Sequence, residues 1–173
     1  SDVCSSDLSY RRAYSFFYMG VTTLCVVAGI GALMALCYPL DAKVNFEVSN
    51  ITGFGRTNRG FEEAFLNFDI DADLTSLVHV NTRLFYSYII AEWGTSKTDK
   101  HTSILWNQLI KREDPVYRVQ NIPGNFTLRQ VGKSIAGQKV NLTFRIQQVP
   151  FVGFMRTKNL LTKEFTLPKK YII

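Results

Sequence analysis

The chain has 173 residues and a formal net charge of +6. Excess basic charge can indicate a nucleic-acid or lipid-surface partner, but after residue 40 the only adjacent basic pairs are Lys111-Arg112 and Lys169-Lys170. The other cations are scattered among acids, whereas a nucleic-acid-binding face needs clustered cations. We therefore interpret the charge as that of a solvated surface and expect no nucleic-acid partner.

Residues 1–8 (SDVCSSDL) are set apart from the reasoning about fold and function. The nucleotides GAC GTG TGC TCT TCC GAT CT, a stretch of a common sequencing-library adapter, translate to the residues from Asp2 to Leu8. We interpret residues 1–8 as adapter-derived and expect the true start of the coding region just upstream of Ser9.

The first element of the chain itself is an uncharged apolar run at residues 16–38. A helix of about 20 apolar residues crosses the hydrocarbon core, whereas the apolar part of a secretory leader has about 7–15. Ala35 and Cys37 would suit a leader cut before Tyr38, but the run before that cut is too long for an ordinary leader. The sequence therefore predicts a transmembrane signal-anchor helix after a short cytoplasmic segment at residues 9–15.

Flanking charges and glycosylation sequons predict the orientation of this helix. Arg11 and Arg12 precede the run directly, and basic residues favour the cytoplasmic side. All three Asn-X-Thr sequons follow the run, and such sequons are glycosylated on the lumenal side. We predict a single-pass type II protein with a lumenal domain at residues 41–173. The candidate glycosylation sites, ranked by their expected accessibility, are Asn141, Asn125 and Asn50.

Small residues recur along the predicted membrane helix at spacings of three and four. Small side chains at this spacing let a second helix approach closely. The same residues are common in membrane helices without such a partner, so the pattern leaves both interpretations open. The candidate helix-packing residues are Ala28, Gly31, Ala32 and Ala35.

The remainder of the chain is predicted to be a β-sandwich of about six to eight antiparallel strands. Strict alternation of apolar and polar residues marks strands with one buried and one solvated face. The cysteines are Cys4, Cys25 and Cys37, so this domain has no disulfide. Its expected strands lie at residues 44–48, 66–72, 84–93 (central in a sheet), 104–110, 126–131, 140–146 and 165–167, and the expected flexible loop lies at residues 53–63.

Residues that could support catalysis or metal binding are few. Asp69, Asp71 and Asp73 share one face of a predicted strand, with neighbours about 7 Å apart, and could serve a cation site or a glycosidase. We favour the polar face of an amphipathic strand instead. His79 and His101 are too far apart in the sequence for a recognisable zinc spacing. We therefore expect no catalytic residue, no metal site and no cofactor in this chain.

An ordered set of segments resembles the signal peptidase complex subunit 3 family. FDIDADL at residues 68–74 is followed by Asn81, Phe85 and YIIAEW at residues 88–93. Further matches are Leu105-Trp106 with Ile110, and the strand that runs from VNLT at residues 140–143 to Val149-Pro150 and Gly153. Departures from the family pattern are Asn107 where Asp is frequent, Arg83 for Lys, and the segment at residues 53–59.

This resemblance implies a non-catalytic subunit of the endoplasmic reticulum signal peptidase complex. Its implied partners are the serine-type catalytic subunit, the other subunits of the complex, membrane lipid and nascent secretory chains. Its implied role is to bind and position the catalytic subunit while signal peptides are removed. Two other classes stay open on the residues alone: an anchored or secreted Ig-like binding module without a role in proteolysis, and a lumenal hydrolase that uses the aspartate face.

Overall fold

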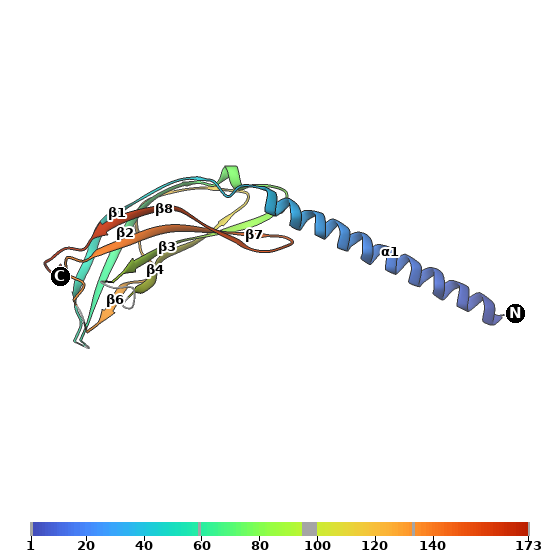
Figure 1. Ribbon diagram of the computed structural model, residues 1–173, viewed down its shortest axis with the longest axis horizontal. Helices are drawn as coiled ribbons and strands as arrows, with labels where there is room; N and C mark the ends of the chain where they lie inside the picture. The colour runs from blue at the N-terminus through green and yellow to red at the C-terminus, as the bar shows by residue number, and fades with distance from the viewer. Residues whose placement is uncertain (1, 59, 95–99, 133, 173) are drawn as a thin grey trace.

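The computed structural model consists of one long helix that projects from a two-layered β domain (Figure 1). It describes residues 2–58, 60–94, 100–132 and 134–172, with side chains from residue 8 onward. The elements are α1 (Asp2–Cys37), β1 (Lys43–Arg56), β2 (Phe61–Asp73), the 3₁₀ turn η1 (Thr75–Leu77), β3 (Thr82–Trp93), β4 (His101–Lys111), β5 (Val116–Pro123), β6 (Leu128–Val131), β7 (Lys139–Pro150) and β8 (Arg156–Thr166).

The strands form two four-stranded antiparallel sheets that pack face to face. One sheet has the order β1-β2-β5, with β6 beside β2, and the other has the order β4-β3-β7-β8. The predicted β-sandwich is therefore confirmed. The expected central strand is also confirmed, because β3 lies between β4 and β7 and buries Phe85, Ile89 and Ala91.

The core between the sheets is made by the alternating apolar residues of both layers. Phe68 and Ile70 of β2 are buried from one side, and Leu142 and Phe144 of β7 from the other. Phe46 of β1 packs on Phe144 across the two layers, with ring centroids 6.0 Å apart. Removal of these side chains from water is the main force that holds the layers together.

The prediction of a flexible loop at residues 53–63 is wrong. β1 continues to Arg56 and β2 begins at Phe61, so the turn is confined to the residues between them. Phe54 is only 1% exposed, and Gly60 has a positive φ of 85° that suits a tight turn. The glycines of this segment suggested a loop, but a strand tolerates glycine where a neighbouring strand and a buried aromatic ring hold it in place.

Glu62 of β2 joins three separate parts of the domain although it is only 5% exposed. Its carboxylate accepts hydrogen bonds from the Ile135 N–H at 2.9 Å, the Ser134 hydroxyl at 3.1 Å and the Tyr171 hydroxyl at 2.8 Å. Burial alone would raise the pKa of this carboxyl, but the hydrogen bonds favour its charged form and lower the pKa below the ordinary value of 4.5.

We expect Glu62→Gln to destabilise the domain at neutral pH by about 1.5–3 kcal/mol, the usual range for hydrogen bonds to a charged group. The folded-state pKa lies below the unfolded one, so the ionic contribution is complete above the unfolded pKa and is lost as the pH falls through the folded pKa. Urea unfolding of both proteins at several pH values from 3 to 7 checks this. A difference that stays constant with pH would contradict it.

Candidate functional site at the helix–domain junction

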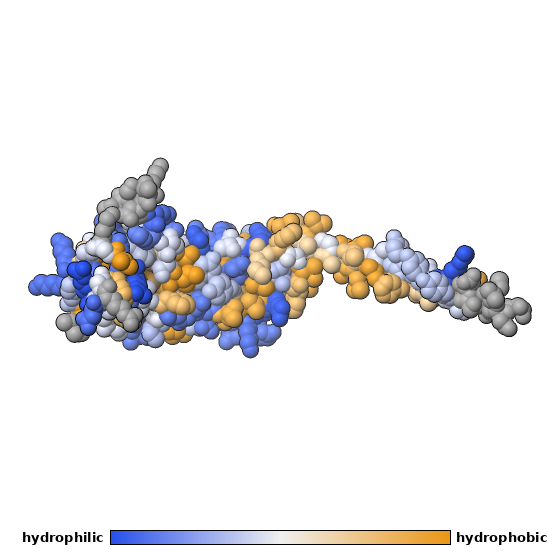
Figure 2. All heavy atoms as spheres, turned by 90° about the horizontal axis from the view of Figure 1, so that it is seen from below, coloured by the Kyte–Doolittle hydropathy of each residue, from blue (hydrophilic) through white to orange (hydrophobic). Residues whose placement is uncertain are grey.

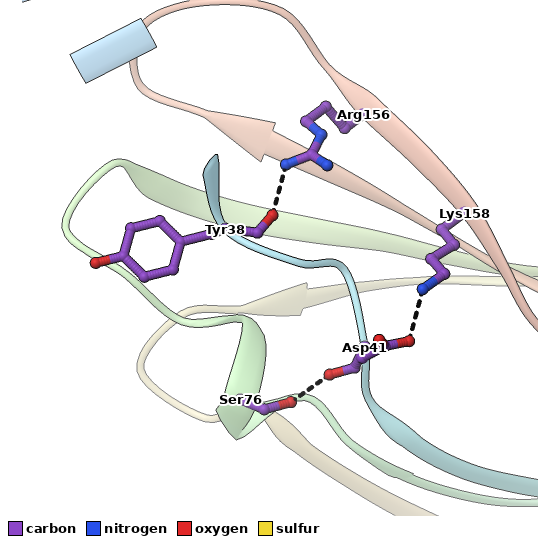
Figure 3. Close-up of polar contacts among 5 residues, drawn as sticks. All are labelled: Tyr38, Asp41, Ser76, Arg156 and Lys158. Carbon is purple, nitrogen blue, oxygen red and sulfur yellow. Dashed lines mark hydrogen bonds and ion pairs between the residues drawn. The ribbon is translucent and has the colours of Figure 1, made fainter. Parts of the chain in front are cut away.

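The segment that joins α1 to β1 is held by polar contacts from two other elements (Figure 3). The Arg156 guanidinium of β8 donates through Nη1 to the carbonyl oxygens of Ala35 and, at 2.7 Å, Tyr38. The Lys158 ammonium forms an ion pair with Asp41 at 2.6 Å, and the Ser76 hydroxyl donates to the Asp41 carbonyl oxygen at 2.6 Å. We call these contacts the junction clamp.

The junction clamp solves a general problem of helix ends. The last carbonyl groups of a helix have no partner within the helix, and the helix dipole makes this end electronegative. Arg156 supplies both hydrogen-bond donors and positive charge at this point. The end of α1 is thus bonded to the edge strand of the β4-β3-β7-β8 sheet.

Apolar and aromatic contacts complete the junction on its other side. Leu40 is 6% exposed and belongs to the core of the domain. The Tyr38 ring stacks on the His79 ring, with centroids 4.9 Å apart. Desolvation lowers the pKa of His79 below its ordinary value of 6.5, which favours the neutral imidazole.

A second contact lies further along α1, toward its N-terminus. The Asn81 side chain donates from Nδ2 to the carbonyl oxygens of Gly31 at 2.9 Å and Val152 at 2.7 Å. Its Oδ1 accepts the Val152 N–H at 3.0 Å. The turn between β7 and β8 reaches the same point, because a Cβ added to Gly153 would lie 3.2 Å from the Ala32 Cβ. Glycine at residue 153, with φ at 108°, permits this approach.

The structure places the small residues of α1 partly against the chain's own domain. Gly31, Ala32 and Ala35 all take part in the contacts of the junction, and Ala35 is only 4% exposed. Ala28, three residues before Gly31, is half-buried. The small residues therefore let the β7–β8 turn approach α1 closely. Packing of a second helix on these residues stays a prediction.

Each aspartate of the predicted acidic face has a local structural partner. Asp69 accepts the Asn121 N–H at 2.6 Å, Asp71 pairs with Arg118 at 3.0 Å, and Asp73 accepts the Thr75 N–H at 3.0 Å. Hydrogen bonds from Thr75 lower the pKa of Asp73. Among the residues that the structure describes, no three His, Cys, Asp or Glu side chains are grouped as metal ligands would be. His79 lies in the connection between η1 and β3, beside Tyr38, and His101 lies at the start of β4, beside Trp93.

The three sequon asparagines are all exposed, on β1, before β6 and on β7. The Asn50 Oδ1 is bonded to the Ile51 N–H, and the Asn125 Nδ2 donates to Asn107. Asn141 faces outward, opposite Glu92 and Glu164, while its neighbours Val140 and Leu142 are buried.

We expect glycosylation at Asn141 first, then Asn125, and Asn50 last. Asn50 follows the end of α1, the predicted membrane helix, closely, and an enzyme that works above the bilayer would have poor access there. Single Asn→Gln replacements, compared by mobility before and after glycosidase treatment, check this order. Modification at Asn50 without modification at Asn141 would contradict it.

A family described as signal peptidase subunit matches residues 7–170, the helix and the β domain together. The chain belongs to the signal peptidase complex subunit 3 family. It is 24% identical to signal peptidase complex subunit 3 of Dictyostelium discoideum over 162 residues, which cover 94% of this chain and 95% of that protein. The Yarrowia lipolytica protein of the same name is 25% identical over 162 residues, which cover 84% of this chain and 88% of the relative.

The Drosophila melanogaster signal peptidase complex subunit 3 is 28% identical over 142 residues, which cover 79% of each protein. The resemblance inferred from ordered sequence segments is therefore confirmed. Of the junction residues, the sequence predicts a packing role only for Gly31, Ala32 and Ala35 of α1. The side chains that bond them from the β domain, Asn81 and Arg156, are not predicted as site residues. One signal was available, because FVGFM at residues 151–155 is unusually apolar for a loop between two strands.

Proposed function

We propose that this signal peptidase complex subunit is non-catalytic, spans the endoplasmic reticulum membrane once, and positions the serine-type catalytic subunit with its lumenal domain. Support for the membrane span comes from α1. Residues Leu8–Cys37 form a helix that is long and apolar enough to cross a membrane, and only 6% of its most apolar stretch is buried against the rest of the chain. Lipid is the solvent that suits such an exposed apolar helix.

The orientation rests on the charges that flank α1. Arg11 and Arg12 lie on the N-terminal side, and this favours a cytoplasmic N-terminus. The β domain, with all three sequons, is then lumenal. Signal peptides emerge on that side of the membrane and are removed there.

The junction clamp is the observation that carries the positioning role. A domain on a flexible linker would move freely above the bilayer, but Arg156, Lys158 and Ser76 bind the linker on two sides (Figure 3). The β-sandwich is consequently held at a fixed height and angle on its membrane helix. A rigid lumenal domain at fixed height can hold a catalytic subunit, and the substrate it cuts, at a constant distance from the bilayer.

Purification of the complex tests this function. The chain, tagged at its C-terminus, is extracted from endoplasmic reticulum membranes in a mild detergent and its partners are identified by mass spectrometry. We expect a serine-type signal peptidase subunit in about equal amount, together with signal peptide cleavage by the eluate. Recovery of the chain without any peptidase subunit would contradict the proposal and favour a separate binding module. A tagged, unrelated single-pass protein of the same membrane is the control.

Asp71→Asn should leave cleavage by the assembled complex within about twofold of the unmodified rate, because exposed ion pairs such as Asp71–Arg118 contribute little. Rates are compared on complexes with equal subunit content. A large loss of turnover with assembly intact would assign the aspartate face a chemical role and contradict the non-catalytic assignment.

A further inference from the structure

The turn between β7 and β8 exposes an apolar surface beside the membrane helix. Phe154 is 83% exposed, and Phe151, Val152 and Met155 are exposed as well. Val80, in the connection that leads into β3, is 82% exposed. Figure 2 shows hydrophobic atoms that continue from the helix onto the adjacent end of the domain. We call residues 151–155 together with Val80 the apolar tip.

The apolar tip contacts α1 at residues that come before the end of the helix, on the side of the predicted membrane span. Gly153 is packed against Ala32, and the Asn81 side chain next to Val80 is bonded to Gly31. Tyr38, directly after the helix, is six residues beyond Ala32. At a rise of 1.5 Å per residue, the contact lies about 9 Å back along the helix from Tyr38. If α1 spans the bilayer up to its C-terminal end, this contact lies within the hydrocarbon core.

The backbone of the apolar tip is adapted to a place without water. Polar backbone groups are tolerated at membrane depth only where other parts of the protein bond them. The Asn81 side chain bonds both the N–H and the carbonyl oxygen of Val152. The main-chain carbonyl oxygen of Asn81 accepts the Phe151 N–H at 2.9 Å. One asparagine thus satisfies three backbone groups of the turn.

Cationic and aromatic side chains border the apolar tip on the side of the domain. Arg156 follows the turn directly and bonds the end of α1, and the Arg112 guanidinium donates to the Val80 carbonyl oxygen at 3.3 Å. Tyr38 lies at the same end of the helix, stacked on His79. Arginine and tyrosine are the residues that collect where hydrocarbon meets lipid headgroups.

We propose that the apolar tip inserts into the membrane leaflet next to the β domain and gives the domain a second contact with lipid. This inference rests on the proposed membrane span of α1. Two contacts with the membrane restrict the domain more than one contact does. The helix sets the position of the domain, and the tip also restricts its tilt and its rotation about the helix axis. The partner is phospholipid, because the tip is continuous with the lipid-exposed surface of α1.

The test uses three full-length proteins with one cysteine each, labelled with an environment-sensitive fluorophore and reconstituted into phosphatidylcholine vesicles. The first keeps Cys25 of α1 and carries Cys4→Ser and Cys37→Ser. The other two carry Phe154→Cys or Val131→Cys, with all three native cysteines replaced by serine. Val131 is the matched control, since it is 73% exposed and lies on β6, at the end of the domain away from α1 (Figure 1).

We expect the label at residue 154 to be quenched by nitroxide-labelled lipid, and to be about fivefold less accessible to aqueous iodide than the label at residue 131, because an inserted group is withdrawn from water. Iodide access equal to that of residue 131 would overturn the proposal. Withdrawal from water without quenching by lipid would also overturn it, since protein would then cover the tip. The Cys25 label distinguishes failure of the tip proposal from failure of the proposed membrane span. If nitroxide-labelled lipid does not quench this label, the proposal that α1 spans the membrane is contradicted.

Discussion

Replacing Trp106 with alanine should lower the free energy of unfolding of the β domain by about 3–5 kcal/mol, the range for truncation of a large buried aromatic side chain. Trp106 of β4 is fully buried. Its ring lies 5.6 Å from Tyr117 of the opposite sheet and 6.2 Å from Phe144 of its own sheet. The side chain therefore fills the space between the layers, and a cavity would remain there in its absence.

Thermal and urea unfolding of the full chain in detergent, followed by the β-sheet circular dichroism signal, measure this loss. Trp106→Phe is the informative control. The Trp106 Nε1–H is buried and has no hydrogen-bond partner among the described residues, so phenylalanine removes an unpaired donor while it keeps most of the ring. We expect this variant to lose less than half as much stability as Trp106→Ala. Equal losses in the two variants would contradict the packing role.

Replacing Arg156 with alanine should loosen the junction while the β-sandwich stays folded. The side chain makes two hydrogen bonds to the end of α1. Hydrogen bonds to a charged group contribute about 1.5–3 kcal/mol, so their loss should raise the equilibrium constant for opening of the junction about 10- to 150-fold. Amide hydrogen exchange of residues 36–42, in the full chain held in lipid nanodiscs, should accelerate by a factor in this range.

Lys139→Ala is the matched control for the junction. Lys139 pairs with Glu164 between the same two strands, β7 and β8, but away from the helix. Loss of this exposed ion pair should leave exchange at residues 36–42 unchanged. If Arg156→Ala and Lys139→Ala behave alike, the clamp does not hold the junction.

The strands that the sequence predicts well are those with uninterrupted alternation. β2 and β7 bury apolar residues at every second position along most of their length, and their faces follow from the sequence directly. β3 is predicted instead by its nearly continuous apolar and aromatic run, and it buries Ile89, Ile90 and Ala91 in succession. Such strands lie inside the sheets, where both neighbours hold the register. Their prediction therefore required no knowledge of tertiary contacts.

β5 was not predicted, and β8 was predicted only at its end, because β-bulges interrupt the alternation of both strands. In β5, Val119 pairs with Ile70 and Ile122 pairs with Phe68, so two residues of β5 lie opposite the single residue Asp69 of β2. Asn121 sits in this bulge with φ at 52°, held by Asp69. β8, expected only at its end, has a register shift at Leu160 and the charged composition of an edge strand.

The junction could be predicted only in part. The length of the apolar run indicates a membrane helix, because the bilayer thickness fixes what can cross it. The contacts of Asn81 and Arg156 with α1 join residues separated by 50 and 121 positions, and no local pattern encodes such pairings. The spacing of the small residues of α1 left open whether a second helix packs on them. The structure shows the chain's own β7–β8 turn on some of them.

Signal peptide cleavage by the assembled complex tests most directly whether the junction holds the β domain at a fixed height. A flexible Gly-Ser segment of about ten residues, inserted between Leu40 and Asp41 in the Arg156→Ala background, would free the domain from the helix. We expect this complex to assemble but to cleave signal peptides more slowly or at shifted positions. Cleavage at the unmodified rate and position, by a complex with full subunit content, would contradict it.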